Sequence, residues 1–193
     1  MPVLPDVLRP GLRVVFCGTA AGAVSAAVGA YYAGPGNKFW RMLHETGLTP
    51  TRLAPLDFRA VLDHGIGLTD LAKEVSGADS VLPGDAFDVA ALLARIEAVR
   101  PEILAFNGKK AAAVFHGVPT GRLGYGPAPG RAGFPPVWVL PSTSGLASRA
   151  WDPAPWHALA AVLQGEKAAR NGTNPRRETQ SRPARVAARG TPC

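Results

Sequence analysis

Three segments of the sequence combine small polar side chains with glycine or proline, the composition that loops use to hold a ligand. The first, 18–22, reads Gly-Thr-Ala-Ala-Gly, and its two glycines let the backbone approach a ligand closely. It lacks the G-x-G-x-x-G spacing of a dinucleotide-binding turn and the Gly-Lys-Ser/Thr of a phosphate-binding loop. On glycine spacing alone, a tight turn from a strand to a helix is the favoured interpretation.

The second segment, 31–40, places two tyrosines before a turn rich in Pro and Gly. Asn37 is suited to capping a helix that follows it, and we expect Phe39 and Trp40 in the core. Tyr32 differs, because an aromatic side chain in a loop beside a ligand site can stack on a planar base.

The third segment, 140–149, contains three consecutive hydroxyl side chains followed by Gly145. Small hydroxyls and backbone N–H groups suit contacts with phosphate. Leu146, if exposed, is the kind of apolar side chain that wedges into a base stack. The alternative is an ordinary polar loop with Leu146 folded inward.

Strand-like and helix-like stretches alternate along the chain and set where these segments lie. The expected strands are 12–17, 103–106 and 137–140, with 66–71 as a strand end or loop, and 117–136 is a Gly/Pro-rich loop. The expected helices are 37–46, 58–63, 89–99, 109–115 and 154–163. Such alternation predicts a parallel sheet with helices on both faces, which binds ligands at the carboxyl ends of its strands. Segments 18–22, 107–110 and 142–149 follow expected strands, so we expect the site there.

The composition describes one globular domain with an extension. The chain has 193 residues, of which 47% are hydrophobic, enough for one core. No apolar run is long enough for a transmembrane helix, and the first residues do not resemble a signal peptide. Cys17 and Cys193 are too few for a disulfide framework or a zinc site, and Cys17 is expected in the core. We therefore expect a reducing, cytoplasmic compartment, no metal and no membrane.

The net charge of +7 is unevenly distributed. Residues 165–193 contain seven Lys and Arg against two Glu, which leaves a net charge of only +2 for residues 1–164. The segment 165–193 has turn-forming composition without hydrophobic periodicity, and we expect a disordered tail after a domain formed by residues 1–164. The tail is a solvated extension or an arm that attracts phosphates. Charge alone does not establish that the domain binds nucleic acid.

In this order, the segments resemble the uracil-DNA glycosylase superfamily, and most closely its mismatch-specific uracil/thymine branch. The resemblance spans about residues 11–163. It rests on four anchors: Gly-Leu-Arg-Val-Val-Phe-Cys-Gly at 11–18, Pro-x-Asn-x-Phe-Trp at 35–40, Gly-Ile-Gly-Leu-Thr-Asp-Leu at 65–71, and Trp-Val-Leu-Pro-x-x-Ser-Gly-Leu at 138–146. No single anchor is decisive, but four in the correct order at compatible spacing form a specific signal.

The resemblance implies a three-layer α/β/α sandwich around a short, mainly parallel sheet, and a monomeric, monofunctional glycosylase without metal or cofactor. Such an enzyme flips uracil out of DNA and hydrolyses its glycosidic bond, leaving an abasic site for base excision repair. In the cell it would associate with the nucleoid through DNA. The implied base-pocket residues are Gly18, Thr19, Ala20, Gly22, Tyr32, Asn37 and Asp70. The implied DNA contacts are Ser142, Thr143, Ser144, Gly145, Leu146, Ser148 and Arg149.

The sequence departs from the branch at two positions that normally carry amides. Ala20 stands where the branch has the Asn that positions the attacking water, and the last loop begins Ser-Thr-Ser-Gly instead of Asn-Pro-Ser-Gly. Asp70 is our candidate replacement, because a carboxylate there can activate water or accept a hydrogen bond from uracil N3–H. A helix cap is the structural alternative for Asp70. Asn107 is a weaker candidate, with a turn residue as its alternative.

The leading hypothesis is therefore a uracil-excising DNA glycosylase with an altered water-binding loop. The same fold could instead excise another deaminated base, or bind uracil-containing or abasic DNA without catalysis. An unrelated α/β nucleotide-binding enzyme is a further alternative. The last is a lyase that uses Lys73, Lys109 or Lys110 as a Schiff-base amine, although none stands at a loop position that demands this role. None of the four histidines is assigned chemistry.

Overall fold

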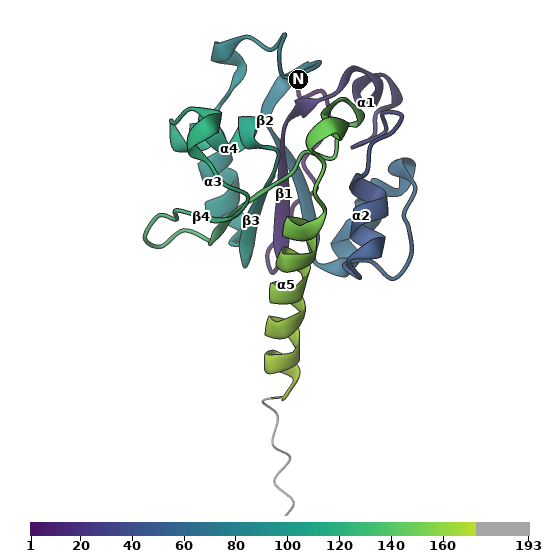
Figure 1. Ribbon diagram of the computed structural model, residues 1–193, viewed down its shortest axis with the longest axis vertical. Coiled ribbons are helices and arrows are strands. Elements are labelled where there is room, and N and C mark those ends of the chain that lie inside the picture. The colour runs from purple at the N-terminus through teal and green to yellow at the C-terminus, as the bar shows by residue number, and fades with distance from the viewer. Residues whose placement is uncertain (173–193) are drawn as a thin grey trace, which may run out of the picture.

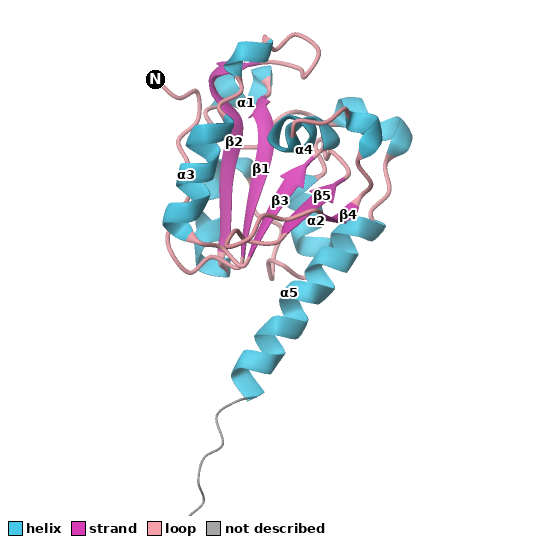
Figure 2. Cartoon of the chain, turned by 90° about the vertical axis from the view of Figure 1, so that its left-hand side faces the viewer, coloured by secondary structure: helices cyan, strands magenta, loops and turns pink. Residues whose placement is uncertain are grey.

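A five-stranded sheet forms the centre of the protein, in the order β2-β1-β3-β5-β4 (Figure 2). The computed structural model describes residues 1–172, except for the side chains of 148–150 and 166–172. The strands are β1 (Val14–Ala21), β2 (Ile66–Ser76), β3 (Ile103–Asn107), β4 (Gly126–Ala128) and β5 (Val137–Leu140). All neighbouring strands pair in parallel except β4 and β5. The expected α/β fold with a mainly parallel sheet is confirmed.

Helices connect the strands and cover both faces of the sheet, with α2 on one side and α3 and α4 on the other (Figure 1). The α-helices are α1 (Ala23–Val28), α2 (Phe39–Glu45), α3 (Val89–Val99), α4 (Lys109–His116) and α5 (Ala154–Gly172). The 3-10 helices are η1 (Pro55–His64), η2 (Gly84–Ala86), η3 (Thr120–Arg122) and η4 (Gly145–Ala150). The expected helix 89–99 is confirmed, whereas 58–63 is part of the 3-10 segment η1 and 117–136 is not all loop, because it contains η3 and β4.

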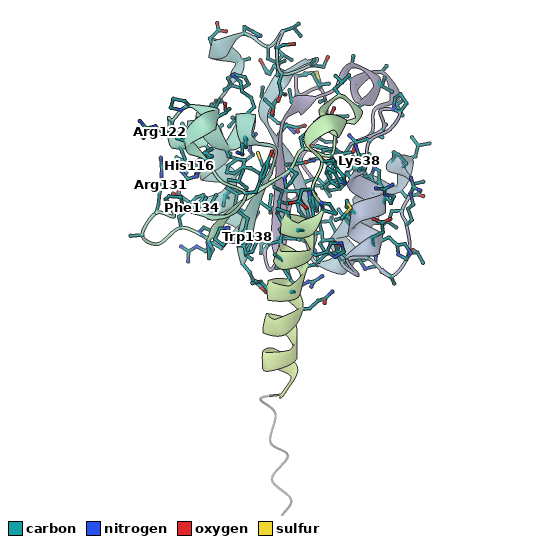
Figure 3. All side chains as sticks on the ribbon, in the orientation of Figure 1. Lys38, His116, Arg122, Arg131, Phe134 and Trp138 are labelled. Atoms are coloured by element: carbon teal, nitrogen blue, oxygen red, sulfur yellow. The ribbon has the colours of Figure 1, made fainter. Side chains whose placement is uncertain are left out.

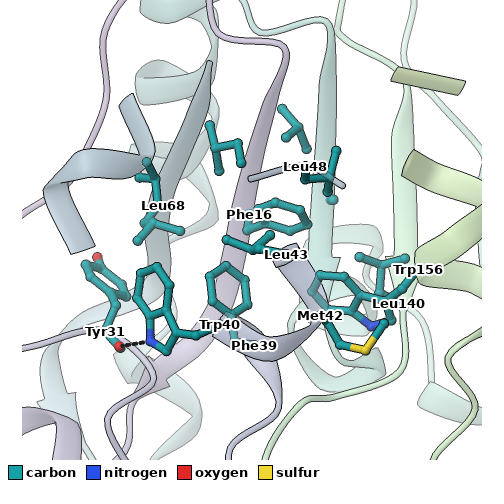
Figure 4. Packing of buried hydrophobic residues seen from close by; sticks show 14 of the residues in the cluster. Phe16, Tyr31, Phe39, Trp40, Met42, Leu43, Leu48, Leu68, Leu140 and Trp156 are labelled. Atoms are coloured by element: carbon teal, nitrogen blue, oxygen red, sulfur yellow. Dashed lines mark hydrogen bonds between the residues drawn. The ribbon is translucent and has the colours of Figure 1, made fainter. Parts of the chain in front are cut away.

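Aromatic side chains fill the core on the α2 face. Phe16 of β1 contacts the edge of Phe39 at 5.3 Å between ring centroids and stacks on Trp156 of α5, also at 5.3 Å. The indole N–H of Trp40 donates to the carbonyl of Tyr31 (Figure 4). Phe39 and Trp40 are therefore core residues, as the sequence predicted.

The core on the other face is mostly aliphatic and packs under α3 and α4. Leu92 and Ile96 of α3 are fully buried, and Phe115 of α4 contacts Phe106 of β3 at 5.0 Å. Cys17 lies in this core and is completely buried, as expected. Because Cys17 and Phe16 are neighbours in β1, their side chains point to opposite faces of the sheet.

Strands β1 and β2 extend further than the sequence predicted, and this difference shapes the site. The expected strand at 12–17 stopped before Gly18, yet β1 runs to Ala21. The expected strand end at 66–71 is an 11-residue strand that continues to Ser76. Gly18 pairs with Asp70, and the register shifts after Ala20. The helix-cap interpretation of Asp70 is therefore wrong, because its backbone belongs to a strand.

The segment before β1 covers the exposed edge of β2. Val7 and Leu68 exchange backbone hydrogen bonds of 2.9 and 3.0 Å. Asp6 accepts a 2.7 Å hydrogen bond from the Thr69 hydroxyl and pairs with Lys73 at 2.8 Å. Covering an edge strand in this way removes a template for pairing with other chains.

The last described helix, α5, continues beyond its expected end at residue 163 to Gly172, and its C-terminal part extends away from the sheet (Figure 1). It therefore crosses the expected boundary between domain and tail at residue 164. The remainder of the expected tail, residues 173–193, lies outside the described residues. Within residues 1–172, no helix combines the length and apolarity needed to cross a membrane.

Candidate active site

A cleft of about 680 Å³ opens at the carboxyl ends of β1, β2, β3 and β5, the edge at which parallel sheets bind ligands. Nearly all residues that the sequence singled out line it. They are Gly18, Thr19, Ala20, Gly22, Tyr32, Asn37, Asp70, Asn107, Ser142, Thr143, Ser144, Gly145 and Leu146. For Ser148 and Arg149 only the backbone, in η4, is described. The structure thus brings together segments that are more than 100 residues apart in the sequence.

The carboxyl group of Asp70 lies directly against the backbone of Gly18 at the floor of the cleft. A Cβ atom at Gly18 would collide with Asp70 Oδ1 and would lie 3.5 Å from the Tyr32 hydroxyl. Glycine is required here to make room for another side chain, and its backbone is otherwise an ordinary continuation of β1. Gly18 therefore belongs to the floor of the site, and the expectation that 18–22 forms a loop is wrong for all but Gly22.

Burial raises the pKa of Asp70 to about 7. The Asp6 carboxylate raises it further, while Lys73 and Arg95 act in the opposite direction. Lys73 and Arg95 both form ion pairs with Asp6, at 2.8 and 3.7 Å, so their positive charges mainly offset the charge of Asp6 and not that of Asp70. Asp70 is only 3% exposed, and its backbone carbonyl accepts a 3.1 Å hydrogen bond from Arg95. Near pH 7 this group is therefore present both as a carboxylic acid and as a carboxylate.

Tyr32 adds an aromatic ring and a buried hydroxyl to the same floor. It has a φ of 55°, which is unusual for a residue with a side chain, and its ring stacks on Phe39 at 3.9 Å between centroids. Its hydroxyl has no hydrogen-bond partner among the described residues. Burial and the nearby Asp70 raise the pKa of Tyr32, while the neighbouring Asn107 side chain lowers it. The hydroxyl therefore remains protonated at neutral pH.

Asn107, the last residue of β3, holds the loop after β5 in place. Its Nδ2 donates to Thr143 Oγ1 at 2.8 Å, and its Oδ1 accepts from the Thr143 backbone N–H at 3.0 Å. The Thr143 carbonyl in turn accepts from the backbone N–H of Lys38 at 2.9 Å. The turn interpretation of Asn107 is wrong, because its amide connects two walls of the cleft.

The loops 34–37 and 143–146 contact each other closely across one side of the cleft. A Cβ atom at Gly145 would lie 2.9 Å from the Pro35 carbonyl oxygen, so only glycine allows this approach. Asn37 Oδ1 accepts from the Phe39 backbone N–H at 3.0 Å at the start of α2, although Lys38 holds the N-cap position itself. Beyond this contact Leu146 is 87% exposed, so the alternative that it folds inward is wrong.

The loop that follows β2 also lines the cleft, although its residues were not among the expected site residues. Gly77, Ala78, Asp79 and Ser80 line the cleft beside β1, and the Gly77 N–H donates to the Ala21 carbonyl at 2.9 Å. Burial raises the pKa of Asp79, while the neighbouring Thr19 hydroxyl and Lys110 lower it. The turn-forming run Ser-Gly-Ala-Asp-Ser at 76–80 was a usable signal. It was overlooked because the strand before it was expected to end at residue 71.

The candidate amines and the histidines lie outside the cleft lining. Lys73 donates to the Tyr31 hydroxyl at 3.1 Å in addition to its pairing with Asp6. Lys109 and Lys110 lie over the rings of Tyr125 and Phe87. Among the histidines, His116 lies with Arg131 and Phe134 on the opposite side of the molecule from Lys38 (Figure 3). Within residues 1–172, no cluster of three His, Cys, Asp or Glu side chains could hold a metal ion.

This open, mainly parallel sheet with a cleft across the carboxyl ends of its strands defines an α/β protein that takes its ligand at that edge. Residues 5–170 match the family described as the uracil DNA glycosylase superfamily, and the chain belongs to that superfamily. It is similar to a protein of Methanosarcina acetivorans, solved by solution NMR and described as a candidate uracil DNA glycosylase. The two share 25% identity at a TM-score of 0.59, over 83% of this chain and 96% of the other. Membership in the superfamily supports a DNA glycosylase that acts in DNA repair.

Proposed function

We propose that the protein is a monofunctional uracil-DNA glycosylase that hydrolyses the bond between uracil and deoxyribose and leaves an abasic site. The observation that supports this most strongly is the floor of the cleft, where Asp70, Tyr32 and Gly18 come together, Asp70 is buried, and the buried hydroxyl of Tyr32 has no hydrogen-bond partner among the described residues. Such an unpaired buried group is costly unless a ligand completes it. A flipped-out base is the planar, polar ligand that fits a site of this kind.

The floor position favours one of the two roles that the sequence suggested for Asp70. A flipped base enters deepest, so its edge meets the floor, while the sugar remains nearer the mouth. A neutral carboxylic acid presents one O–H donor and one C=O acceptor side by side. These match the carbonyl oxygen and the N3–H of uracil. We therefore assign Asp70 to reading the base edge.

The charge state of Asp70 also affects departure of the base. When the glycosidic bond breaks, its electron pair moves onto the base, which becomes an anion. An ionised carboxylate at the floor would repel that anion, whereas a neutral Asp70 donates a hydrogen bond to it. Because the pKa of Asp70 is about 7, we expect the excision rate to fall as the pH rises above 7.

A single assay tests the proposed activity. The full chain is incubated with labelled duplexes that contain one uracil opposite guanine or adenine, and abasic sites are then cleaved with alkali. Strand breaks that require alkali indicate a monofunctional glycosylase, whereas breaks without alkali indicate a lyase. A band shift without breaks identifies a catalytically silent binder, and the absence of any interaction contradicts the proposal. Duplexes with hypoxanthine or mismatched thymine extend the test to other bases.

Two substitutions at Asp70 separate the two roles. If Asp70 reads the base edge, Asp70→Asn retains a donor and an acceptor, and its single-turnover rate at pH 6.5 should stay within about tenfold of wild type, whereas Asp70→Ala should lose roughly 10²-fold. The Asn variant should also lack the alkaline fall in rate. If Asp70 instead activates water, Asp70→Asn should be as slow as Asp70→Ala, with a loss of roughly 10²-fold or more.

A further inference from the structure

If Asp70 reads the edge of the base at the floor, another polar group must orient the water that attacks the sugar. The expected position for a water-binding amide is Ala20, whose methyl group cannot orient water. Ala20 lies where the β1–β2 register shifts, and it pairs with Ala72. Neither strand therefore offers a polar side chain at that point of the ladder.

The loop after β2 brings a second carboxylate into the cleft. Asp79 lines the cleft, and its carboxylate lies beside the hydroxyl of Thr19 on β1. Among the described residues, Asp70 and Asp79 are the two carboxylates that line the cleft. They differ in burial, because Asp70 is 3% exposed at the floor while Asp79 is an exposed residue at the rim.

We propose that Asp79 is a catalytic residue that orients the attacking water and accepts its proton. The inference rests on the proposed glycosylase function. As the bond from C1′ to the base breaks, its electron pair leaves with the base, and the water oxygen forms the new bond to C1′. One water proton passes to the Asp79 carboxylate and from there to solvent, and the departing base takes up a proton from solvent. The products are an abasic site and free uracil.

The surroundings of Asp79 suit this role. Partial burial raises the pKa of Asp79, which suits a group that must accept a proton, while the neighbouring Thr19 hydroxyl on β1 and the charge of Lys110 on α4 act in the opposite direction. A carboxylate at the rim, on the sugar side of the base, also stabilises the positive charge that develops on the sugar. The same charge placed at the floor would oppose the anionic base. The two aspartates thus suit opposite ends of the bond that breaks.

The test compares single-turnover uracil excision by Asp79→Asn, Asp79→Ala and the matched control Asp85→Asn. Asp85 lies in η2 on the same connection to α3, is exposed, and does not line the cleft. We expect both Asp79 variants to lose roughly 10²-fold in rate, the usual contribution of one general base, while the control keeps the wild-type rate. Affinity for a duplex containing uracil should not weaken, because removing a negative charge near DNA favours binding.

Chemical rescue provides a second measurement. Added formate should raise the excision rate of Asp79→Ala by at least about tenfold but should not raise that of Asp79→Asn. Equal concentrations of chloride serve as the salt control. A rate for Asp79→Asn within threefold of wild type overturns the proposal. So does a loss of rate matched by an equal loss of DNA affinity, which would indicate that Asp79 only shapes the loop. A wild-type protein that forms no abasic sites instead refutes the proposed function itself.

Discussion

The floor and the rim of the cleft are built in different ways and serve different needs. The floor consists mainly of strand residues, of which Asp70 and Asn107 are 3% and 7% exposed. The rim consists of loops, and its most prominent side chain, Leu146, is 87% exposed. Burial raises the pKa of Asp70 to about 7. A group that activates water or contacts DNA instead requires access to solvent. The two regions therefore could not exchange residues and keep their chemistry.

Several features of the floor lower the stability of the folded protein. A buried acid with a pKa of about 7 and a buried tyrosine hydroxyl without a partner among the described residues both oppose folding. The backbone of Tyr32, at a φ of 55°, adds local strain. Such locally destabilising features are typical of functional sites in natural proteins. The comparison predicts that floor substitutions change catalysis and stability together, whereas rim substitutions change function alone.

The largest effect is expected at Gly18, where substitution by alanine should reduce uracil excision by about 10³-fold. The new Cβ collides with Asp70 Oδ1, so the carboxyl group must rotate away, and the methyl group also displaces the base. A misplacement of about 1 Å costs roughly 10²-fold by itself, and the displaced carboxyl group adds to it. Single-turnover kinetics measure the loss, and circular dichroism should show a retained fold.

Gly84→Ala is the control for that substitution. A Cβ atom added at Gly84 would meet no described atom within 4 Å, and the φ of this glycine is not in the left-handed region. The rate should therefore remain at the wild-type value. An active Gly18→Ala variant would show that the floor tolerates a displaced Asp70, which contradicts its role in reading the base.

The cost of burying Asp70 predicts that Asp70→Asn stabilises the protein at high pH. Because the folded pKa is about 7 and the ordinary value is 3.8, the native state binds more protons than the unfolded state between these pH values. Wild-type stability therefore falls as the pH rises through this window, and the neutral Asn variant escapes this loss. The stability advantage of the variant should be about 3 kcal/mol larger at pH 8 than at pH 5.

Urea unfolding of both proteins at the two pH values measures this difference. Effects of the substitution that do not depend on pH cancel in the comparison. An advantage that is the same at pH 5 and pH 8 would mean that Asp70 titrates alike in the folded and unfolded states. Its burial would then be of no electrostatic consequence.

Asn107 connects the two regions, and Asn107→Ala should destabilise the protein by about 2 kcal/mol. The substitution leaves the N–H and the hydroxyl of Thr143 without their partner, and Thr143 is only 1% exposed. Thermal or urea unfolding measures the loss. In a double-mutant cycle with Thr143→Val, the two losses should not add fully, because both substitutions break the hydrogen bond between Asn107 Nδ2 and Thr143 Oγ1. Additive losses would contradict the assigned contact.

The sequence predicted the sheet, the long helix α3 and the grouping of the loops, because these depend on hydrophobic periodicity and on the order of strands. It failed at the backbone of Gly18, which was expected to lie in a loop, and at Asp70, for which a strand end or loop was expected and a helix cap was the alternative. Glycine and aspartate disfavour strands when taken alone, yet here the missing Cβ of one makes room for the side chain of the other. Such complementarity between two strands is invisible in either local sequence.

Asp79 was not predicted as a site residue for a related reason. Its role as a lining residue follows from the true end of β2 at Ser76, five residues beyond the expected end at residue 71. Strand ends are the least certain part of any interpretation from sequence. Because β2 ends at Ser76 and not at residue 71, Asp79 lies at the carboxyl edge of the sheet and not in the middle of a connecting segment. The site residues that could be predicted were those in glycine-marked segments, such as Gly145.

The smallest effect is expected at the rim, where Leu146→Ala should weaken binding to a uracil-containing duplex by about fivefold and leave the unfolding midpoint unchanged. Leu146 is 87% exposed, so its side chain contributes little to folding, but an apolar side chain at the mouth can fill the gap that a flipped base leaves. Leu56→Ala, at a leucine that is 72% exposed and does not line the cleft, is the control and should change neither quantity. A destabilised Leu146→Ala variant would erase the distinction between floor and rim, whereas unchanged affinity would show that DNA is held by the polar part of the loop alone.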